Sequence, residues 1–424
     1  MRFTSLRRVG AVLAATAVVG ATLTACGSDD SSSAPEAENT DGRGPITFAM
    51  GKNDTDKIIP IIDRWNKEHP DEEVTLSELA GEADAQRETL VQSLQAGNTD
   101  YDVMALDVVW TAQFAANQWL APLTGDLEVD TSELLDATVE SATYNDTLYA
   151  LPQNTNGQLL FRNTEIIPEA PTDWASLKES CKQAEEAQVD CLTLQLKQYE
   201  GLTVNTAGFM AGWGGSVLED DGKTPAVDSD ASKEGLQALV DGYEDGTVAK
   251  DSTAATEEET NLAFTEGKTA YAVNWPYMYA NSEEDGSAVA GKVEVQPLVG
   301  KDGVGVSTLG GYNNGININS EHKATARDFI EFVVSEESQR SFAEASFPPV
   351  LASIYDDQEL IAEQPYLPAL KESLENAKPR PVSPFYDAIS KAIQDNAYAA
   401  VNGDADVDKA TADMKAAIEN ASAE

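Results

Sequence analysis

An alternation of strand and helix patterns predicts an α/β fold with a parallel sheet. Short apolar runs at 46–50, 74–76 and 101–109 are typical of strands. The segments between them, 56–67 and a stretch that ends at Gly97, carry apolar residues at helical spacing. Strand, helix, strand, helix, strand in this order is typical of a parallel sheet covered by helices. About 380 residues follow residue 44, enough for two domains or one large two-lobed body.

The remainder of the chain adds helices and a few further strands. We expect mainly helix over 174–243, and then a helix that ends at Gly267, where a strand leads to Trp275. A polar-apolar strand at 310–319, one amphipathic helix over 322–342 and helix again over 388–418 complete the expected elements.

The N-terminus has the pattern of an export signal. Arg2, Arg7 and Arg8 precede an uncharged run, 9–25, that is shorter than the roughly 20 residues needed to cross a bilayer. Leu23-Thr24-Ala25-Cys26 resembles a bacterial lipobox, which predicts a lipoprotein signal peptide at 1–25 and diacylation of Cys26. The Ser/Asp/Glu/Pro-rich stretch 26–44 has the composition of a disordered tether. The alternatives are a signal peptide with an incidental cysteine, or an uncleaved anchor.

The charge balance excludes one large class of partners. The chain has 28 basic and 73 acidic residues, a net charge of −45. This charge repels phosphate backbones, so nucleic-acid binding is excluded. It also argues against strongly anionic ligands, although solubility alone explains most of it.

Two cysteines remain after Cys26. Outside the cytoplasm, Cys181 and Cys191 are most simply one disulfide that closes a short loop. A metal pair is the alternative, but neither His69 nor His322 is near in sequence. We expect no metal, no cofactor and no catalytic residue, because the zinc motif H-E-x-x-H, the nucleophile elbow G-x-S-x-G and phosphate-binding glycine loops do not occur.

Five groups of short segments form a recognisable set: 94–97 with 101–103, 149–152 with 159–162, 263–268 with 274–276, 310–313 and 379–384. In these segments the chain resembles the extracellular solute-binding proteins of ABC sugar importers, of the maltose/trehalose-binding type. The segments occur in the family's order and span nearly the whole chain after the tether. The segments 106–111, 155–160 and 274–276 are most similar to the actinobacterial trehalose-binding lipoproteins.

The resemblance implies a two-lobed periplasmic-binding-protein (Venus flytrap) fold with hinge strands and the solute between the lobes. It implies a first lobe of 45–155 and 312–348 and a second lobe of 156–311 and 349–424, with the last crossing after Phe347-Pro348-Pro349. It also implies a disaccharide ligand, most simply trehalose or a maltose-like α-glucoside. The partners would be the permease subunits of an ABC importer and, through Cys26, the outer face of the cell membrane.

Sugars offer hydroxyls, which pair with carboxylates and amides, and flat C–H faces, which aromatic rings cover. Polar residues after strands and residues that match the family's motifs are therefore the candidate ligand-binding residues. The principal candidates are Asp54, Asp107, Asn156, Glu257, Trp275, Gly311, Tyr312 and Arg380. The second set consists of Arg87, Trp110, Asn154 and Tyr277, with Asn53 and Gln86 as neighbours.

Ordinary structural roles are the alternatives for these residues. Asp107 could cap a helix, Asp54 could form an Asx turn, Trp110 could pack in the core, and Glu257 could be a solvated helix start. A glycoside hydrolase that pairs Asp107 with Glu257 is the alternative function, and a binding protein for a different small solute is a further one.

Overall fold

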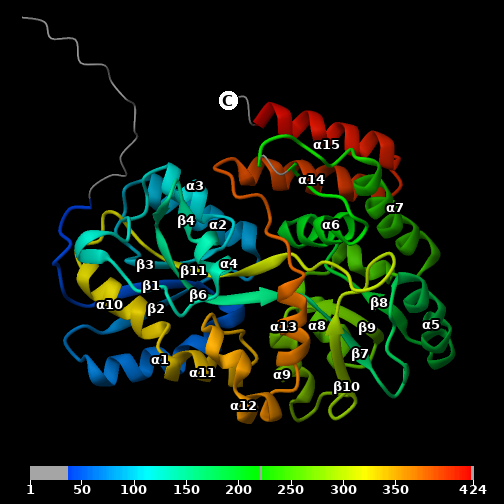
Figure 1. Cartoon of the computed structure of the whole chain (residues 1–424), viewed down its shortest axis with the longest axis horizontal. Helices are drawn as coiled ribbons and strands as arrows, with labels where there is room; N and C mark the ends of the chain where they lie inside the picture. The colour runs from blue at the N-terminus through cyan, green and yellow to red at the C-terminus, as the bar shows by residue number, and fades with distance from the viewer. Residues whose placement is uncertain (1–36, 220–221, 422–424) are drawn as a thin grey trace, which may run out of the picture. The chain divides into compact units, whose positions relative to one another are not determined.

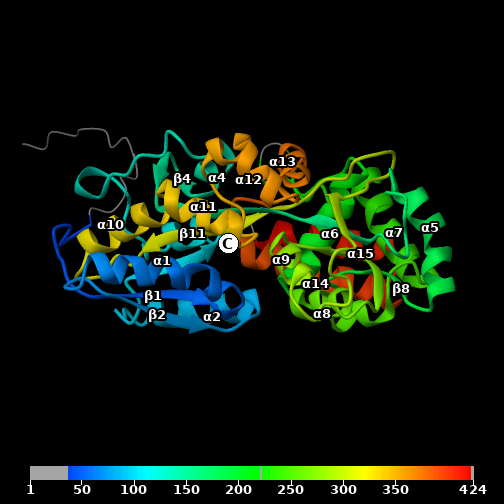
Figure 2. The same ribbon diagram turned by 90° about the horizontal axis from the view of Figure 1, so that it is seen from below.

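Two β-sheets organise the chain in the computed structural model, which describes residues 37–219 and 222–421. The strands of the two sheets lie in different halves of the molecule in both ribbon views (Figure 1, Figure 2). The expected signal peptide 1–25, Cys26 and most of the expected tether lie outside the described residues.

The first sheet has the strand order β2-β1-β3-β11-β6. Its strands are β1 (Ile46–Gly51), β2 (Val74–Leu79), β3 (Val103–Asp107), β6 (Ala150–Gly157) and β11 (Leu309–Ile316). The first three are parallel and are connected by α1 (Thr55–Glu68) and α2 (Ala83–Gln95), which confirms the predicted alternation. Strand β11 is antiparallel to both of its neighbours, β3 and β6.

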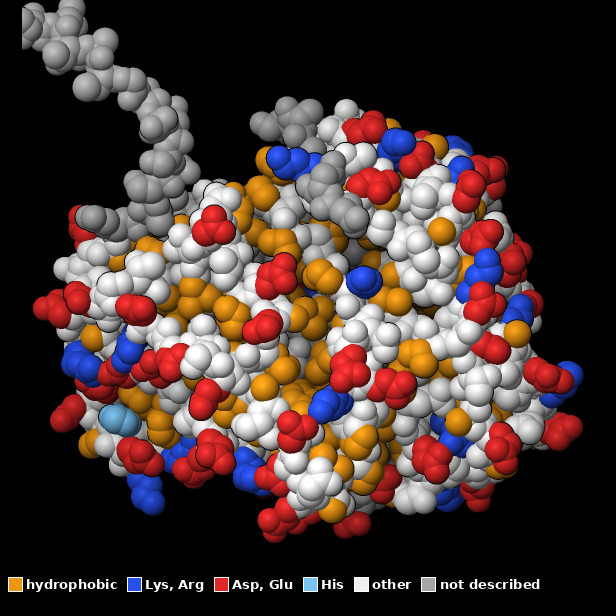
Figure 3. Space-filling view, viewed as in Figure 1, with side chains coloured by type: hydrophobic (Ala, Val, Ile, Leu, Met, Phe, Trp, Pro, Cys, Tyr) orange, Lys and Arg blue, Asp and Glu red, His pale blue; other side chains and the backbone are white. Residues whose placement is uncertain are grey.

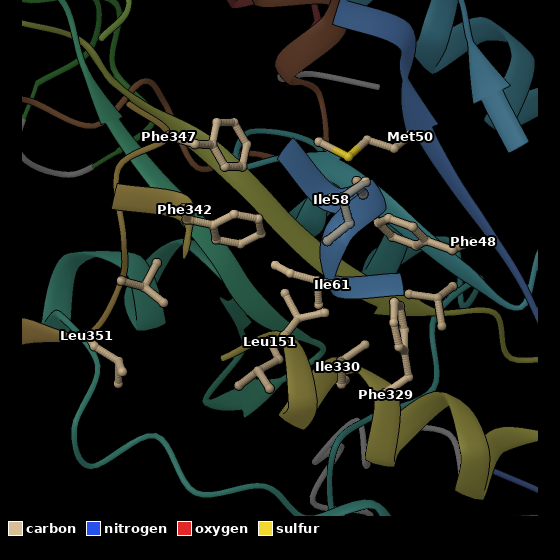
Figure 4. Close-up of a cluster of buried hydrophobic side chains, with 14 of the residues drawn as sticks. Phe48, Met50, Ile58, Ile61, Leu151, Phe329, Ile330, Phe342, Phe347 and Leu351 are labelled. Carbon is tan, nitrogen blue, oxygen red and sulfur yellow. The ribbon is translucent and has the colours of Figure 1, made fainter. Parts of the chain in front are cut away.

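A single apolar cluster fills the first lobe (Figure 4). The aromatic rings of Phe48 and Phe329 meet edge to face at 5.6 Å between α10 (Lys323–Val333) and the sheet. The single helix expected over 322–342 is wrong, because Ser335 begins a new helix there, α11 (Glu336–Glu344), by accepting a hydrogen bond from the Ser338 N–H.

The expected last lobe crossing at 347–349 is also wrong. Apolar side chains from Val350 to Leu370 pack in the first-lobe cluster and not in the second. They come from the helical turn Ala352–Asp356, α12 (Gln358–Glu363) and α13 (Leu367–Glu375). The chain therefore remains in the first lobe through α12 and α13 and crosses to the second lobe later than expected.

The second sheet has the order β10-β7-β9-β8. Its strands are β7 (Leu159–Asn163), β8 (Asp190–Thr193), β9 (Thr269–Asn274) and β10 (Val293–Pro297). Its helices are α5 (Trp174–Ala187), α6 (Glu200–Gly212), α7 (Asp230–Asp245), α8 (Glu257–Thr265), α9 (Tyr277–Glu283), α14 (Tyr386–Val401) and α15 (Val407–Ala421). The structure contains a disulfide between Cys181 of α5 and Cys191 of β8. Strand β8 interrupts a stretch that was expected to be mainly helical.

Small elements complete the first lobe: α3 (Thr111–Ala116), α4 (Asp136–Ser141), and the hairpin β4 (Thr143–Tyr144) and β5 (Thr147–Leu148). Within the described residues, no helix has the length and apolarity required to cross a bilayer.

Three neighbouring segments of the chain connect the lobes, and they pass through Gln158, Ser307 and Lys378. The chain leaves β6 for β7 at Gln158, whose N–H donates to Ser307 Oγ at 2.7 Å and whose carbonyl accepts from Ser373 Oγ at 2.9 Å. In the third segment, the Lys378 carbonyl accepts a hydrogen bond from the Leu309 N–H, and the Lys378 N–H donates to the Ser307 carbonyl. These short ladders form the hinge.

Residues 37–44 were assigned to the tether but contact the first lobe. Ala37 packs against its apolar cluster, and Arg43 forms ion pairs with Glu72 and Asp328. The Gly44 N–H donates to Thr325 Oγ1 at 3.2 Å. The ordered body therefore begins before residue 45.

Candidate functional site

A cavity lies between the lobes and is lined by both. It lies where β1, β3 and β9 end and where α6 and α8 begin. In α/β sheets, ligands bind outside the carboxyl ends of the strands. In Figure 3, hydrophobic side chains gather near the middle of the face shown, and acidic ones are spread over both halves.

All eight principal candidates from the sequence line this interlobe cavity: Asp54, Asp107, Asn156, Glu257, Trp275, Gly311, Tyr312 and Arg380. Of the second set, Tyr277 lines it, as do the neighbours Asn53 and Gln86. Residues separated by more than 300 positions in the chain thus converge on one space.

Three candidates of the second set do not line the cavity. Asn154 is buried, and its Oδ1 accepts from the Tyr312 N–H at 3.1 Å, so it supports the cavity wall from behind. Arg87 and Trp110 face a neighbouring cavity, which we call the second interlobe cavity. Arg87 forms an ion pair with Asp387 at 2.8 Å, across the lobes.

Arg380 is held by two carboxylates from different lobes. Its guanidinium donates to Asp107 Oδ1 at 2.7 Å and to Glu200 Oε1 at 2.6 Å, and the residue is 4% exposed. Such buried charge-assisted bonds are strong only when both partners are present. The two carboxylates raise the pKa of Arg380 far enough to outweigh its burial. Among the residues that the structure describes, none accepts a hydrogen bond from its buried Nε.

Glu200 was not predicted from the sequence. It begins α6, is buried, and accepts from Arg380, from Ser390 Oγ at 2.6 Å and from the Tyr386 hydroxyl. Burial raises its pKa despite Arg380. Its position after strand β8 could have indicated a site residue. The sequence analysis expected continuous helix there and did not predict this strand. Tyr199, Val204 and Phe347 are further lining residues that the sequence did not indicate.

Asp54 and Tyr312 form a polar pair on the first-lobe side. The Tyr312 hydroxyl donates to Asp54 Oδ2 at 3.4 Å, a long bond that leaves the carboxylate open to a ligand. Burial raises the pKa of Asp54 from 3.8 to about 6. Burial and the nearby carboxylates also raise the pKa of Tyr312 well above its usual value, so the phenol stays protonated.

Glu257, Trp275 and two tyrosines form the second-lobe side. Glu257 Oε2 accepts from the Tyr199 hydroxyl at 2.7 Å, and burial raises the pKa of its carboxyl. The Glu257 carbonyl accepts from the Asn274 side chain at 3.1 Å and from the Tyr277 hydroxyl at 3.3 Å. Glu257 is thus a fixed acceptor in the cavity and not the solvated helix start that was the alternative.

Two glycines let the strand β11 approach the site closely. A Cβ on Gly310 would lie 3.0 Å from two atoms at the outer edge of the Trp275 ring, so the indole approaches the backbone closely there. Gly311 has φ +122°, and a Cβ on it would meet the Asn154 carbonyl at 2.3 Å. Opposite Gly310, Asn156 lines the cavity, and its buried Oδ1 has no hydrogen-bond partner among the described residues.

The polar groups of the cavity are mainly acceptors. Among its described lining residues, four are acidic and Arg380 is the single basic one, already paired with Asp107 and Glu200. An anionic ligand would be repelled, and a neutral ligand with several hydroxyl donors would find free acceptors. Trp275, Tyr277 and Tyr312 supply aromatic surface for the apolar faces of such a ligand.

Comparisons with known proteins agree with this geometry. The family described as "Bacterial extracellular solute-binding protein" matches residues 51–340. A "Probable ABC transporter-binding protein" of Deinococcus radiodurans is 27% identical over 376 residues, which are 83% of this chain and 88% of the relative. An "Arabinooligosaccharide-binding protein" of Bacillus subtilis is 21% identical over 351 residues, 79% of each chain. The solved structure of maltose-bound MalE3 of T. maritima has a TM-score of 0.84 and 29% identity, and covers 89% of this chain and 99% of that one.

Proposed function

The chain belongs to the bacterial extracellular solute-binding proteins, and we propose that it captures a neutral disaccharide for the permease of an ABC importer. Trehalose, or another α-linked disaccharide of glucose such as maltose, is the first candidate ligand. Like its relatives, the protein is a binding protein and not an enzyme. Lipidation of Cys26 would hold it at the outer face of the membrane, near the permease.

One observation carries this proposal: free acceptors and aromatic surfaces from both lobes face the same cavity. Asp54 and Asn156, whose Oδ1 has no partner among the described residues, come from the first lobe, and Glu257 and Trp275 come from the second lobe. A ligand that bonds both lobes stabilises the closed arrangement and shifts the population toward it. The bound maltose of the T. maritima protein, 29% identical to this chain, and the arabinooligosaccharides of the B. subtilis relative support a sugar as the solute.

The geometry favours binding over glycoside hydrolysis. A hydrolase that used Asp107 and Glu257 would need one carboxylate as nucleophile or base. Asp107 is already bonded to Arg380 at 2.7 Å and to the Val109 N–H at 3.2 Å. Its charge therefore stabilises the lobe contact and is not available for attack on a sugar carbon.

Titration calorimetry of the purified protein against trehalose, maltose and glucose tests the proposal. We expect one disaccharide to bind tightly and to be recovered intact, and Trp275→Ala to weaken it about 10-fold to 100-fold through the lost aromatic surface. Trp275→Phe, which keeps an aromatic ring, is the matched control and should lose much less. Release of glucose, or the absence of binding to every disaccharide, would refute the proposal.

A further inference from the structure

The second interlobe cavity adjoins the proposed sugar site but is separate from it. It is lined by residues of both lobes: Asp84, Arg87 and Trp110 from the first, and Tyr386, Asp387 and Gln394 among those from the second. Glu200 lines both cavities, so the two spaces meet at this residue.

The partition between the two cavities is a buried ion cluster. Arg380 faces the sugar cavity and bonds Asp107 and Glu200, while Tyr386 and Ser390 bond Glu200 from the side of the second cavity. Arg380 is 4% exposed and Glu200 is 6% exposed. The cluster is therefore anchored in both lobes and cannot swing aside without losing several charge-assisted bonds.

We propose that the Arg380–Glu200 partition sets the length of the sugar that the protein accepts, by closing one end of the sugar cavity. The inference rests on the proposed function and extends it to the choice between disaccharides and longer oligosaccharides. A third sugar ring directed at this end would meet the guanidinium instead of empty space.

The space behind the partition is suited to a further sugar ring. Its lining includes Trp110, which is 3% exposed, and the carboxylates of Asp84 and Asp387, the second of which is paired with Arg87. Acceptors beside an aromatic ring are the combination that sugar hydroxyls and C–H faces require. Removal of the partition should thus turn two cavities into one elongated site.

The test compares a disaccharide with the trisaccharide of the same linkage, maltose and maltotriose or the corresponding pair, by calorimetry. The wild type should prefer the disaccharide by at least about tenfold. The variant Arg380→Ala/Glu200→Gln opens the partition without leaving Glu200 as an uncompensated charge, and its preference should fall by about tenfold or reverse. Because Arg380 can also donate to the bound sugar, the ratio of the two affinities is the readout.

Two further variants make the result specific. Glu200→Gln alone leaves the guanidinium bonded to Asp107 and should change the ratio less than the opened variant does. Gln394→Trp, added to the opened variant, fills the second cavity and should remove the gained trisaccharide binding while sparing the disaccharide.

Each outcome decides the inference. A folded opened variant with an unchanged ratio overturns the partition but leaves the proposed function in place. A wild type that binds both sugars equally well overturns it without any variant, which covers the case in which the opened variant fails to fold. A wild type that binds neither sugar, nor any other disaccharide, overturns the proposed function and this inference with it.

Discussion

Replacement of Asp54 by Asn should stabilise the ligand-free protein near neutral pH. Burial raises the pKa of this carboxyl from 3.8 to about 6, roughly two units, and each unit corresponds to about 1.36 kcal/mol. The partly buried carboxylate therefore costs up to about 3 kcal/mol of folding free energy when it is fully ionised. The measured gain should be smaller, because opening of the lobes gives Asp54 access to water.

The sign of the pH dependence follows from the same shift. Between pH 3.8 and about 6 the folded protein holds the proton that the unfolded chain has lost, so ionisation of Asp54 destabilises the fold as pH rises through this window. The stability gained by Asp54→Asn should be near zero at a pH of about 4 and largest above a pH of about 7.

Urea unfolding of both proteins across this pH range measures the gain. Asp63→Asn, on the exposed side of α1, is the matched control and should not show it. A gain that is the same at both ends of the range, or a variant less stable than the wild type at high pH, would refute the reasoning. The variant should also bind the sugar more weakly, since an amide is a poorer acceptor than a carboxylate.

Three other predictions follow from the backbone, the disulfide and the expected anchor. Gly311→Ala should cost on the order of 2–4 kcal/mol in urea unfolding, because its φ is +122° and a Cβ would meet Asn154, and a neutral result would contradict the described backbone. Loss of the disulfide in Cys181→Ser/Cys191→Ser should cost about 2–3 kcal/mol for a loop with a sequence separation of 10, and an unchanged unfolding midpoint would argue against a formed bridge. Cys26→Ser should move the protein from the membrane fraction to the medium, as an immunoblot of cell fractions would detect, and unchanged membrane retention would exclude the lipid anchor.

The local sequence pattern was sufficient to predict the parallel strands of the first lobe's sheet and part of the candidate site. Three regularly spaced strands predicted the parallel arrangement, and the strand-end rule pointed directly to Asp54 and Asp107. The motifs shared with known sugar-binding proteins added Glu257, Trp275 and Arg380, whose proximity to the first two depends on contacts between distant parts of the chain.

Other features depend on tertiary contacts that a local pattern does not contain. Strand β8 has four residues and lies between two helices, so its periodicity is too short to distinguish it from them. Because this strand was not predicted, Glu200, which follows it in the chain, was not predicted as a site residue either. The segment from Val350 to Leu370 has the amphipathic pattern of any packed helix, and this pattern does not say which of two cores receives it. The double proline at 348–349 marked a break in the chain but not a change of lobe.

The position of β11 also constrains the order in which the protein can be built. This strand lies between β3 and β6, and β6 has no other partner in its sheet. A nascent chain that has reached only residue 300 can pair β1, β2 and β3, but β6 remains an open edge able to pair with another chain. Completion of the first lobe must therefore await contacts between segments about 150 to 210 positions apart in the sequence, a topology that folds slowly. Truncations or stalls before residue 309 should aggregate rather than yield a free-standing first lobe.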